Sequence, residues 1–129
     1  MTAINFKREI ADTLDHAIER ATKALTAEGF GVLTRIDMHS KIKEKIGKDI
    51  IPTVILGACN PNLAYEAYGA NPDVTSLLPC NAVLRELAPG KISLEFVKPT
   101  AMMLILGDAK LAELAREADA RIERALGNA

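Results

Sequence analysis

Residues 53–61 read Thr-Val-Ile-Leu-Gly-Ala-Cys-Asn-Pro and contain the most apolar strand-like segment of the chain. A short apolar run of this kind predicts a strand over 53–58 at the centre of a sheet. Asn60 is a favourable N-cap and Pro61 suits the first position of a helix, so a helix is predicted over 61–68. The segment therefore predicts a sheet with helices packed on it.

Upstream of this strand, apolar residues recur first at every second position and then at helical spacing. The alternation of Ile4 and Phe6 indicates a strand, and the stripe that begins at Ile10 indicates a long helix that stops at Gly29. Four elements are predicted in this half: a strand over 3–8, a helix over 10–28, a strand over 31–37 and a short helix over 40–46.

Downstream, the pattern indicates a β-hairpin around Ala88-Pro89-Gly90, because Ile92, Leu94 and Phe96 alternate with polar residues in its second arm. Asp108 is a suitable N-cap for a last amphipathic helix. The elements predicted here are strands over 80–87 and 91–97, a helical turn over 99–106 and a helix from the Asp108 cap to Leu126.

The order of these elements predicts an α+β fold. The hairpin excludes a purely parallel sheet. We expect one compact domain over residues 1–129, with a mixed β-sheet of about five strands that helices cover mainly on one face. Hydrophobic residues make up 49% and charged residues 26% of the chain, a balance that supports a core without metal or disulfide.

The composition excludes several classes of partner. The net charge is −1, from 16 Lys and Arg against 17 Asp and Glu, whereas a chain that grips phosphate backbones carries a basic excess. Aromatic residues are only 4% and Trp is absent, so a base-stacking platform is not expected. No apolar run is long enough to span a membrane, and no secretory signal opens the sequence. We therefore expect a cytoplasmic protein with two free cysteines that binds neither nucleic acid nor membrane.

Two stretches stand out together: Ile55-Leu56-Gly57-Ala58-Cys59-Asn60-Pro61 and Leu77-Leu78-Pro79-Cys80-Asn81. They are preceded by Gly29-Phe30-Gly31-Val32-Leu33 and Ile36-Asp37 and followed by Pro99 and Met102. In this order and spacing they resemble the family catalogued as domain of unknown function 302, over essentially the whole chain. The resemblance implies a compact α+β fold and a homodimer, but it supplies no activity.

Two positions depart from the pattern of that family. Thr53 stands after Pro52 where an aromatic residue is usual, and Lys98 stands before Pro99 where an acidic residue is usual. If that acid contributes to a site in the family, the site is altered here.

Cys59 lies between an apolar strand and the predicted start of a helix. The helix dipole and unpaired N–H groups at such a place lower the pKa of a thiol. Asn60 and Asn62 add amide groups that could hold an anion or a carbonyl oxygen. A structural interpretation competes, since a free cysteine is a small hydrophobe and Asn60 and Pro61 are explained by helix initiation.

Cys80 opens the hairpin, and the predicted pairing turns it towards the core and Asn81 the other way. Whether the two thiols meet depends on topology. A parallel return after the helix would place the sulfurs at opposite ends of the sheet, about 20 Å apart. A return along residues 71–79 would make them neighbours, and that segment is long enough for either arrangement.

The sequence leaves any cofactor unknown and predicts no metal site. Two cysteines are too few for a closed zinc site, which needs four ligands. His39 could act with Cys59 as a nucleophilic pair only if the fold brought the two together. No phosphate-binding loop or nucleophile elbow is present.

Three functions stay open on these observations. The first is a homodimeric domain that binds a small ligand near the Cys59-Asn60-Pro61 turn. The second is a thiol-based enzyme or redox protein that uses Cys59, and the third is a structural or interaction module without a ligand. The candidate ligand-binding residues are Cys59, Asn60, Asn62, Cys80 and Asn81.

The dimer is expected to form through the sheet face opposite the helices. A solvated face would be uniformly polar, but this one is predicted to carry branched apolar side chains, and a two-fold copy of the same patch is the simplest cover. The residues predicted on it are Val83, Leu87 and Val97 beside Arg85, Ser93 and Glu95.

Overall fold

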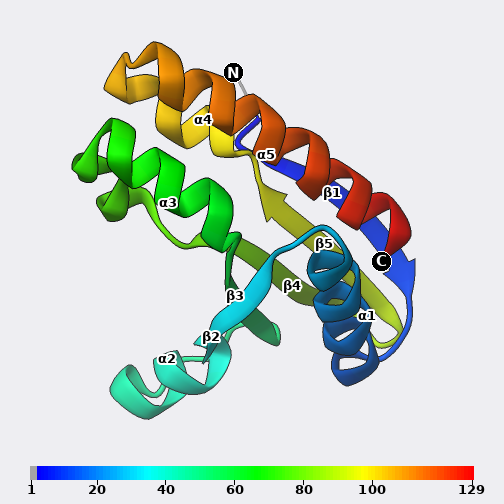
Figure 1. The fold of residues 1–129 in the computed structure, drawn as a ribbon. Helices are drawn as coiled ribbons and strands as arrows, with labels where there is room; N and C mark the ends of the chain where they lie inside the picture. Colours follow the sequence, from blue (N-terminus) through cyan, green and yellow to red (C-terminus); the bar gives the residue numbers. More distant parts are fainter. Residues whose placement is uncertain (1–2) are drawn as a thin grey trace.

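The structure is a computed structural model that describes residues 3–129 (Figure 1). The strands are β1 (Asn5–Ala11), β2 (Gly31–Asp37), β3 (Thr53–Cys59), β4 (Cys80–Ala88) and β5 (Lys91–Val97). The α-helices are α1 (Leu14–Ala27), α2 (Met38–Ile46), α3 (Pro61–Ala70), α4 (Pro99–Met103) and α5 (Ala109–Asn128), and the 3-10 helices are η1 (Pro72–Leu77) and η2 (Leu104–Leu106).

The five strands form one sheet in the order β1-β5-β4-β3-β2, and every neighbouring pair is antiparallel. The predicted α+β class, with about five strands and helices mainly on one face, is confirmed. The sheet is antiparallel throughout rather than mixed, because the chain re-enters it at the end where it left: Ala58 of β3 pairs with Cys80 of β4. The central strand is β4 rather than β3, since β5 and β1 continue the sheet on its far side.

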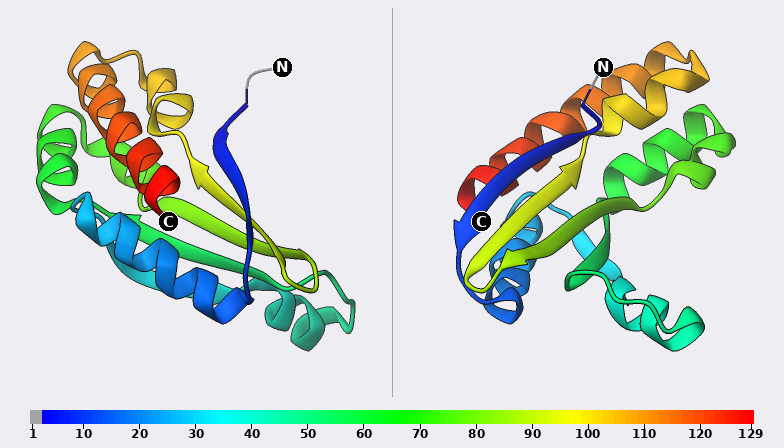
Figure 2. Two further views of the ribbon diagram at one scale, coloured as in Figure 1. Left: turned by 90° about the vertical axis from the view of Figure 1, so that its right-hand side faces the viewer. Right: turned by 180° about the vertical axis from the view of Figure 1, so that it is seen from behind.

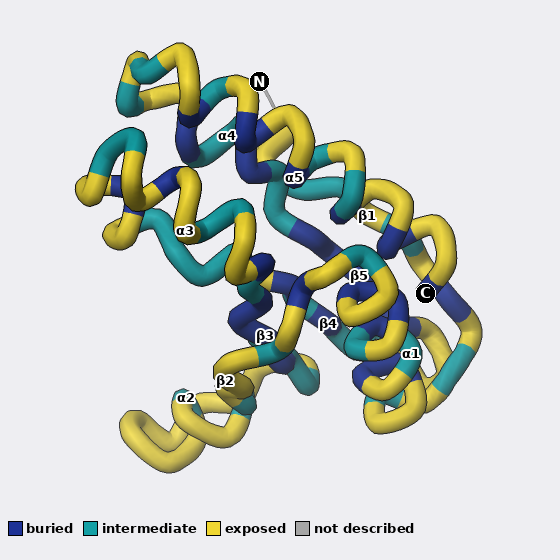
Figure 3. The backbone as a smooth tube through the Cα atoms, viewed as in Figure 1, coloured by how far each residue is buried: buried dark blue, intermediate teal, exposed yellow. Residues whose placement is uncertain are grey.

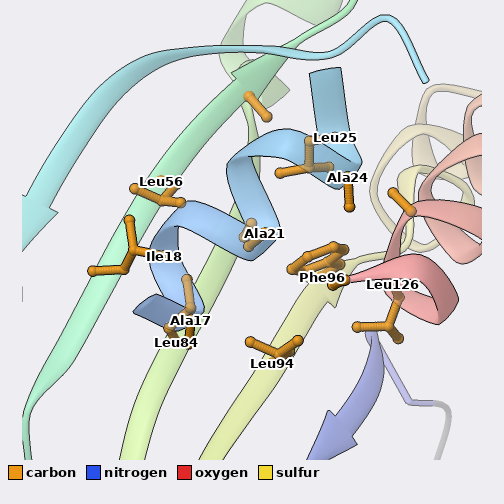
Figure 4. Close-up of a cluster of buried hydrophobic side chains, with 14 of the residues drawn as sticks. Ala17, Ile18, Ala21, Ala24, Leu25, Leu56, Leu84, Leu94, Phe96 and Leu126 are labelled. Carbon is orange, nitrogen blue, oxygen red and sulfur yellow. The ribbon is translucent and has the colours of Figure 1, made fainter. Parts of the chain in front are cut away.

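Helices α1 and α5 cover one face of the sheet, as the two views of Figure 2 show. Their apolar stripes meet alternate residues of the strands in one cluster, drawn in Figure 4. Its side chains include Ala17, Ile18, Ala21, Ala24 and Leu25 of α1, Leu56, Leu84, Leu94 and Phe96 of the strands, and Leu126 of α5. This cluster is the main core, and its strand residues lie on the face that the sequence alternation predicted.

The first strand is longer than predicted, and the first helix begins later. Ile10 was expected to open the helix but pairs with Ile92 in the sheet and is buried there. The helix starts after Thr13, whose hydroxyl accepts a hydrogen bond from the His16 backbone N–H (3.2 Å). A side chain of this kind satisfies an N–H group that the helix itself cannot, so the cap sets the boundary.

A second, smaller cluster lies beyond the end of the sheet. It joins α3, η1, α4 and the first half of α5, which lie side by side at the top of Figure 1. Its buried residues are Ala67, Val74, Met103, Leu111, Leu114 and Ala115. The opposite end of the molecule is different, because α2 and β2 are largely exposed (Figure 3).

The hairpin pairs Leu84 with Leu94 as predicted, but Lys91 pairs with Ala88 rather than Leu87. An irregularity between Glu86 and Ala88 accounts for the change, since it leaves Leu87 outside the regular ladder. No helix within residues 3–129 has both the length and the apolar character to cross a membrane.

Gly57 of β3 allows the chain that returns to the sheet at Pro79 to pack closely against β3. A Cβ atom at this position would lie 2.8 Å from Cγ of Pro79, the residue before β4, and would collide with the hydroxyl of Thr34. The space above Gly57 is therefore filled from two sides, and only a residue without a side chain fits there.

We predict that Gly57→Ala destabilises the fold by about 1–3 kcal/mol, because overpacking must displace both Thr34 and Pro79. Gly69→Ala is the matched control, since a Cβ there meets nothing within 4 Å, and it should stabilise α3 by about 0.5–1 kcal/mol. Urea unfolding of both variants measures the difference. A Gly57→Ala protein as stable as the wild type would contradict this packing.

Candidate functional site

A cavity of about 30 Å³ lies where the main core meets the second cluster. That volume is about twice the minimum that a buried water needs, so the cavity admits one small group and not a whole metabolite. The ends of β3 and β4 form its floor, and α3, α4 and α5 form its walls. The lining residues are Phe30, Ala58, Cys59, Asn60, Leu63, Ala64, Ala67, Leu78, Cys80, Met103, Leu114 and Ala118.

Both cysteines line this cavity, so the question that the sequence left open is answered. The pairing of Ala58 with Cys80 places the two thiols at the same end of the sheet, and both are free and half-buried. Cys80 also packs against the main core, as predicted. The return along residues 71–79 is therefore the correct alternative, and the parallel crossover is wrong.

The expected activation of Cys59 is not supported. Burial raises the pKa of its thiol, which is the opposite of the lowering expected from the helix start. Burial raises the pKa of Cys80 further, to about 11, with smaller contributions from the nearby Cys59 and Asp119. Burial therefore favours the neutral thiol form of both side chains.

Asn60 is the N-cap of α3, as predicted: its Oδ1 accepts a hydrogen bond from the Leu63 backbone N–H (3.1 Å). Only 5% of the residue is exposed. Its amide nitrogen lies against Gly29, where an added Cβ would come within 2.9 Å of it. The side chain thus joins the start of α3 to the turn after α1, which makes it chiefly a structural wall of the cavity.

The other polar candidates lie outside the cavity. Asn62 and Asn81 are exposed and do not line it. His39 lies at the opposite end of β3, where its Nδ1 accepts a hydrogen bond from the Thr53 backbone N–H (3.0 Å). A strand of this length separates it from Cys59 by about 20 Å, so the two do not form a nucleophilic pair.

Two residues that deviate from the family pattern also lie away from the cavity. Thr53 donates its hydroxyl to the carbonyl of Ile51 (2.8 Å) at the far end of β3. Lys98 holds its ammonium 5.0 Å from the centre of the Phe6 ring. Neither departure alters the wall of the cavity.

Most of the apolar residues that line the cavity could not be predicted from the sequence. Leu63 and Leu114 are spaced as ordinary core residues on their helices, and a methionine in an apolar segment such as 101–106 is more often a core residue than a ligand contact. Met103 is buried and does fill the second cluster, but it also borders the cavity. Only the packing of α3 against α5 brings these side chains to the thiols, and no local pattern carries that signal.

A wider groove of about 580 Å³ runs between α3 and α5 and shares Leu63 and Leu114 with the inner cavity. Its rim carries both signs of charge, and Arg121 donates to Glu117 at 2.8 Å across one turn of α5. The charged residues that line it are Glu66, Lys110, Glu113, Arg116, Glu117 and Arg121. The arrangement is thus an apolar cavity with two thiols, next to a polar groove.

Comparison with known proteins places this geometry in a family. No curated protein matches the chain. A crystal structure of an uncharacterized conserved protein DUF302 from Bacillus stearothermophilus is similar to it, with 29% identity, a TM-score of 0.90 and 98% of each chain covered. The model of the family described as domain of unknown function DUF302 matches residues 6–129. Because that match spans nearly the whole chain, the protein belongs to the DUF302 family.

Proposed function

We propose that the protein binds a small ligand at the cavity that Cys59 and Cys80 line. The observation that carries the proposal is the shared boundary of cavity and groove at Leu63 and Leu114. A ligand with a small apolar or soft end would place that end against the thiols. Its polar remainder would lie in the groove, where carboxylates and guanidinium groups offer partners of both signs.

The raised pKa values favour this function over thiol catalysis, since a neutral, half-buried thiol is a poor nucleophile. They do not weaken binding of an apolar group, which only requires a dry surface of matching size. A purely structural module would gain no stability from a cavity between two otherwise packed clusters, because the side chains around an unfilled space lose dispersion contacts.

Xenon is a suitable probe for the inner cavity, because apolar cavities accept it. Xenon pressure should shift the amide NMR signals of Cys59, Ala64 and Cys80 in the wild type. Ala64→Leu should abolish the shifts by filling the cavity, whereas Ala109→Leu, at an exposed position of α5, should leave them unchanged. Absence of shifts in the wild type, or equal shifts in the Ala64→Leu protein, would refute the proposed site.

We also propose that the protein forms a homodimer through the sheet face opposite α1 and α5. The strand registers align Ile36, Ile55 and Val83 side by side across β2, β3 and β4. Ile36 is 42% exposed, and the row continues onto Glu95 of β5. A row of branched apolar side chains on an uncovered face favours a partner that presents the same row about a two-fold axis.

Two charged residues of this face, Arg85 and Glu95, are already paired within the chain. Arg85 Nε donates to Glu95 Oε2 at 2.7 Å, and Ser93 Oγ donates to the same oxygen at 2.9 Å. Glu95 and Ser93 are only 7% and 5% exposed, respectively. Covering this pair with a second copy would therefore leave neither of the two charges without a partner, which lowers the cost of burying them.

Val83→Asp should shift the protein from dimer towards monomer in sedimentation at low micromolar concentration, because it places an unpaired charge in the apolar row. Tyr65→Asp is the control, since Tyr65 is 82% exposed on α3, a helix that packs against α5. A wild-type protein that sediments as a monomer at high micromolar concentration would rule out the dimer.

A further inference from the structure

Three sulfur-bearing side chains converge on the inner cavity. Cys59 comes from the end of β3, Cys80 from the start of β4 and Met103 from the end of α4. They include both cysteines of the chain and one of its four methionines. The other residues around the cavity are apolar apart from Asn60, whose oxygen is engaged in capping α3. The cavity therefore presents sulfur, and almost nothing else, as a potential ligand atom.

We propose that the cavity binds one soft monovalent metal ion of the Cu(I) class, held by the sulfur atoms of Cys59, Cys80 and Met103. This inference rests on the proposed ligand-binding function and names the class of ligand. Thiolate and thioether sulfur select Cu(I), whereas Mg²⁺ and Ca²⁺ require oxygen ligands. A cavity of about 30 Å³ has room for a single ion.

The number of ligands that rules out a zinc site does not rule out a soft monovalent ion. Structural zinc takes four ligands, and residues 3–129 contain no group of three or more His, Cys, Asp or Glu side chains that could hold a metal. Cu(I) is satisfied by two or three sulfur ligands. The expectation of no metal site came from counting zinc ligands, and that count does not apply to a methionine-containing set.

The binding step balances in charge without any change of oxidation state. Cu⁺ forms bonds to the two cysteine sulfurs, both thiols release their protons to solvent, and the thioether of Met103 donates a lone pair. The product carries one negative charge. The apolar walls of the cavity keep water from the ion.

The fold explains why Met103, rather than its neighbour Met102, lines the cavity with the thiols. Asp119 of α5 accepts hydrogen bonds from the Thr100 backbone N–H (3.0 Å) and hydroxyl (2.6 Å), which holds the first turn of α4 against α5. With α4 held in this way, Met103 is 6% exposed and lines the cavity, while Met102 packs only at the edge of the second cluster. The two methionines form a matched pair for a test.

The test is an anaerobic titration of the reduced, full-length protein with Cu(I) against a coloured Cu(I) chelator. The wild type should take one Cu(I) per chain and develop ultraviolet absorption from copper–thiolate bonds. Met103→Leu should weaken binding by at least about tenfold, a loss found even for residues that only support metal ligands. Met102→Leu should bind as the wild type does, and Cys59→Ser or Cys80→Ser should lose the absorption band.

Leucine is close to methionine in volume, so the Met103→Leu comparison holds even if a serine variant unfolds. X-ray absorption of the wild-type complex gives an independent readout and should show only sulfur around copper. No binding by the wild type, nitrogen or oxygen ligands, or equal affinity of the Met103→Leu and wild-type proteins would overturn the three-sulfur site. If xenon enters the cavity but Cu(I) does not bind, this inference fails and the proposed ligand site stands.

Discussion

The antiparallel pairing of β3 with β4 is the constraint on which the rest of the structure depends. Once Ala58 is hydrogen-bonded opposite Cys80, the chain between them must leave the sheet and return at the same end. Leu63 of that excursion, residues 61–79, packs against the main core, but its buried residues Ala67 and Val74 do not belong to that core. The excursion must bury these side chains against something else, and α4 and the first half of α5 provide that surface. The second cluster and the cavity beside the thiols follow from this single register.

Helix α5 joins the two hydrophobic clusters. Its second half contributes residues such as Ile122 and Leu126 to the main core, and its first half contributes Leu111 and Leu114 to the smaller one. Its C-terminal end is held by Arg8 of β1, whose guanidinium donates to the carbonyls of Leu126, Gly127 and Ala129 at 2.9–3.0 Å. Bonds of this kind satisfy carbonyls that a helix end leaves free. The cavity between the two clusters therefore depends on the position of α5.

The thiols lie where the two clusters meet, and this position accounts for their chemistry. A cysteine deep in one core would be an inert hydrophobe, whereas one at a solvated helix start would be acidic. Cys59 and Cys80 lie between these extremes, half-buried against apolar walls with their pKa values raised by burial. Such a site suits a ligand that prefers sulfur and avoids water more than it suits an attacking thiolate.

Local patterns predicted most of the secondary structure because caps and periodicity are local properties. Asn60 and Asp108 cap their helices as expected, and the alternation of Ile92, Leu94 and Phe96 gave the correct core face. Pairing between distant segments was not predictable in the same way. No residue close to Ile10 in the sequence indicates that Ile10 pairs with β5 in a strand.

The direction of β4 was likewise beyond a local analysis, since residues 71–79 are long enough for either topology. For the same reason the sequence identified both cysteines but not their proximity. The sequence alone does not single out Met103, because its place beside the thiols depends on how α4 lies against α5.

The central claim is that β3, β4 and α4 bring their sulfur-bearing residues to one cavity. The most direct measurement is the set of nuclear Overhauser contacts made by the Met103 ε-methyl group in protein with labelled methionine methyls. Our account predicts contacts from that methyl to the β-protons of Cys80 and to the Ala64 methyl group, and no contact from Met102 to Cys80. Contacts from Met102 in place of Met103, or no contact between Met103 and Cys80, would contradict it.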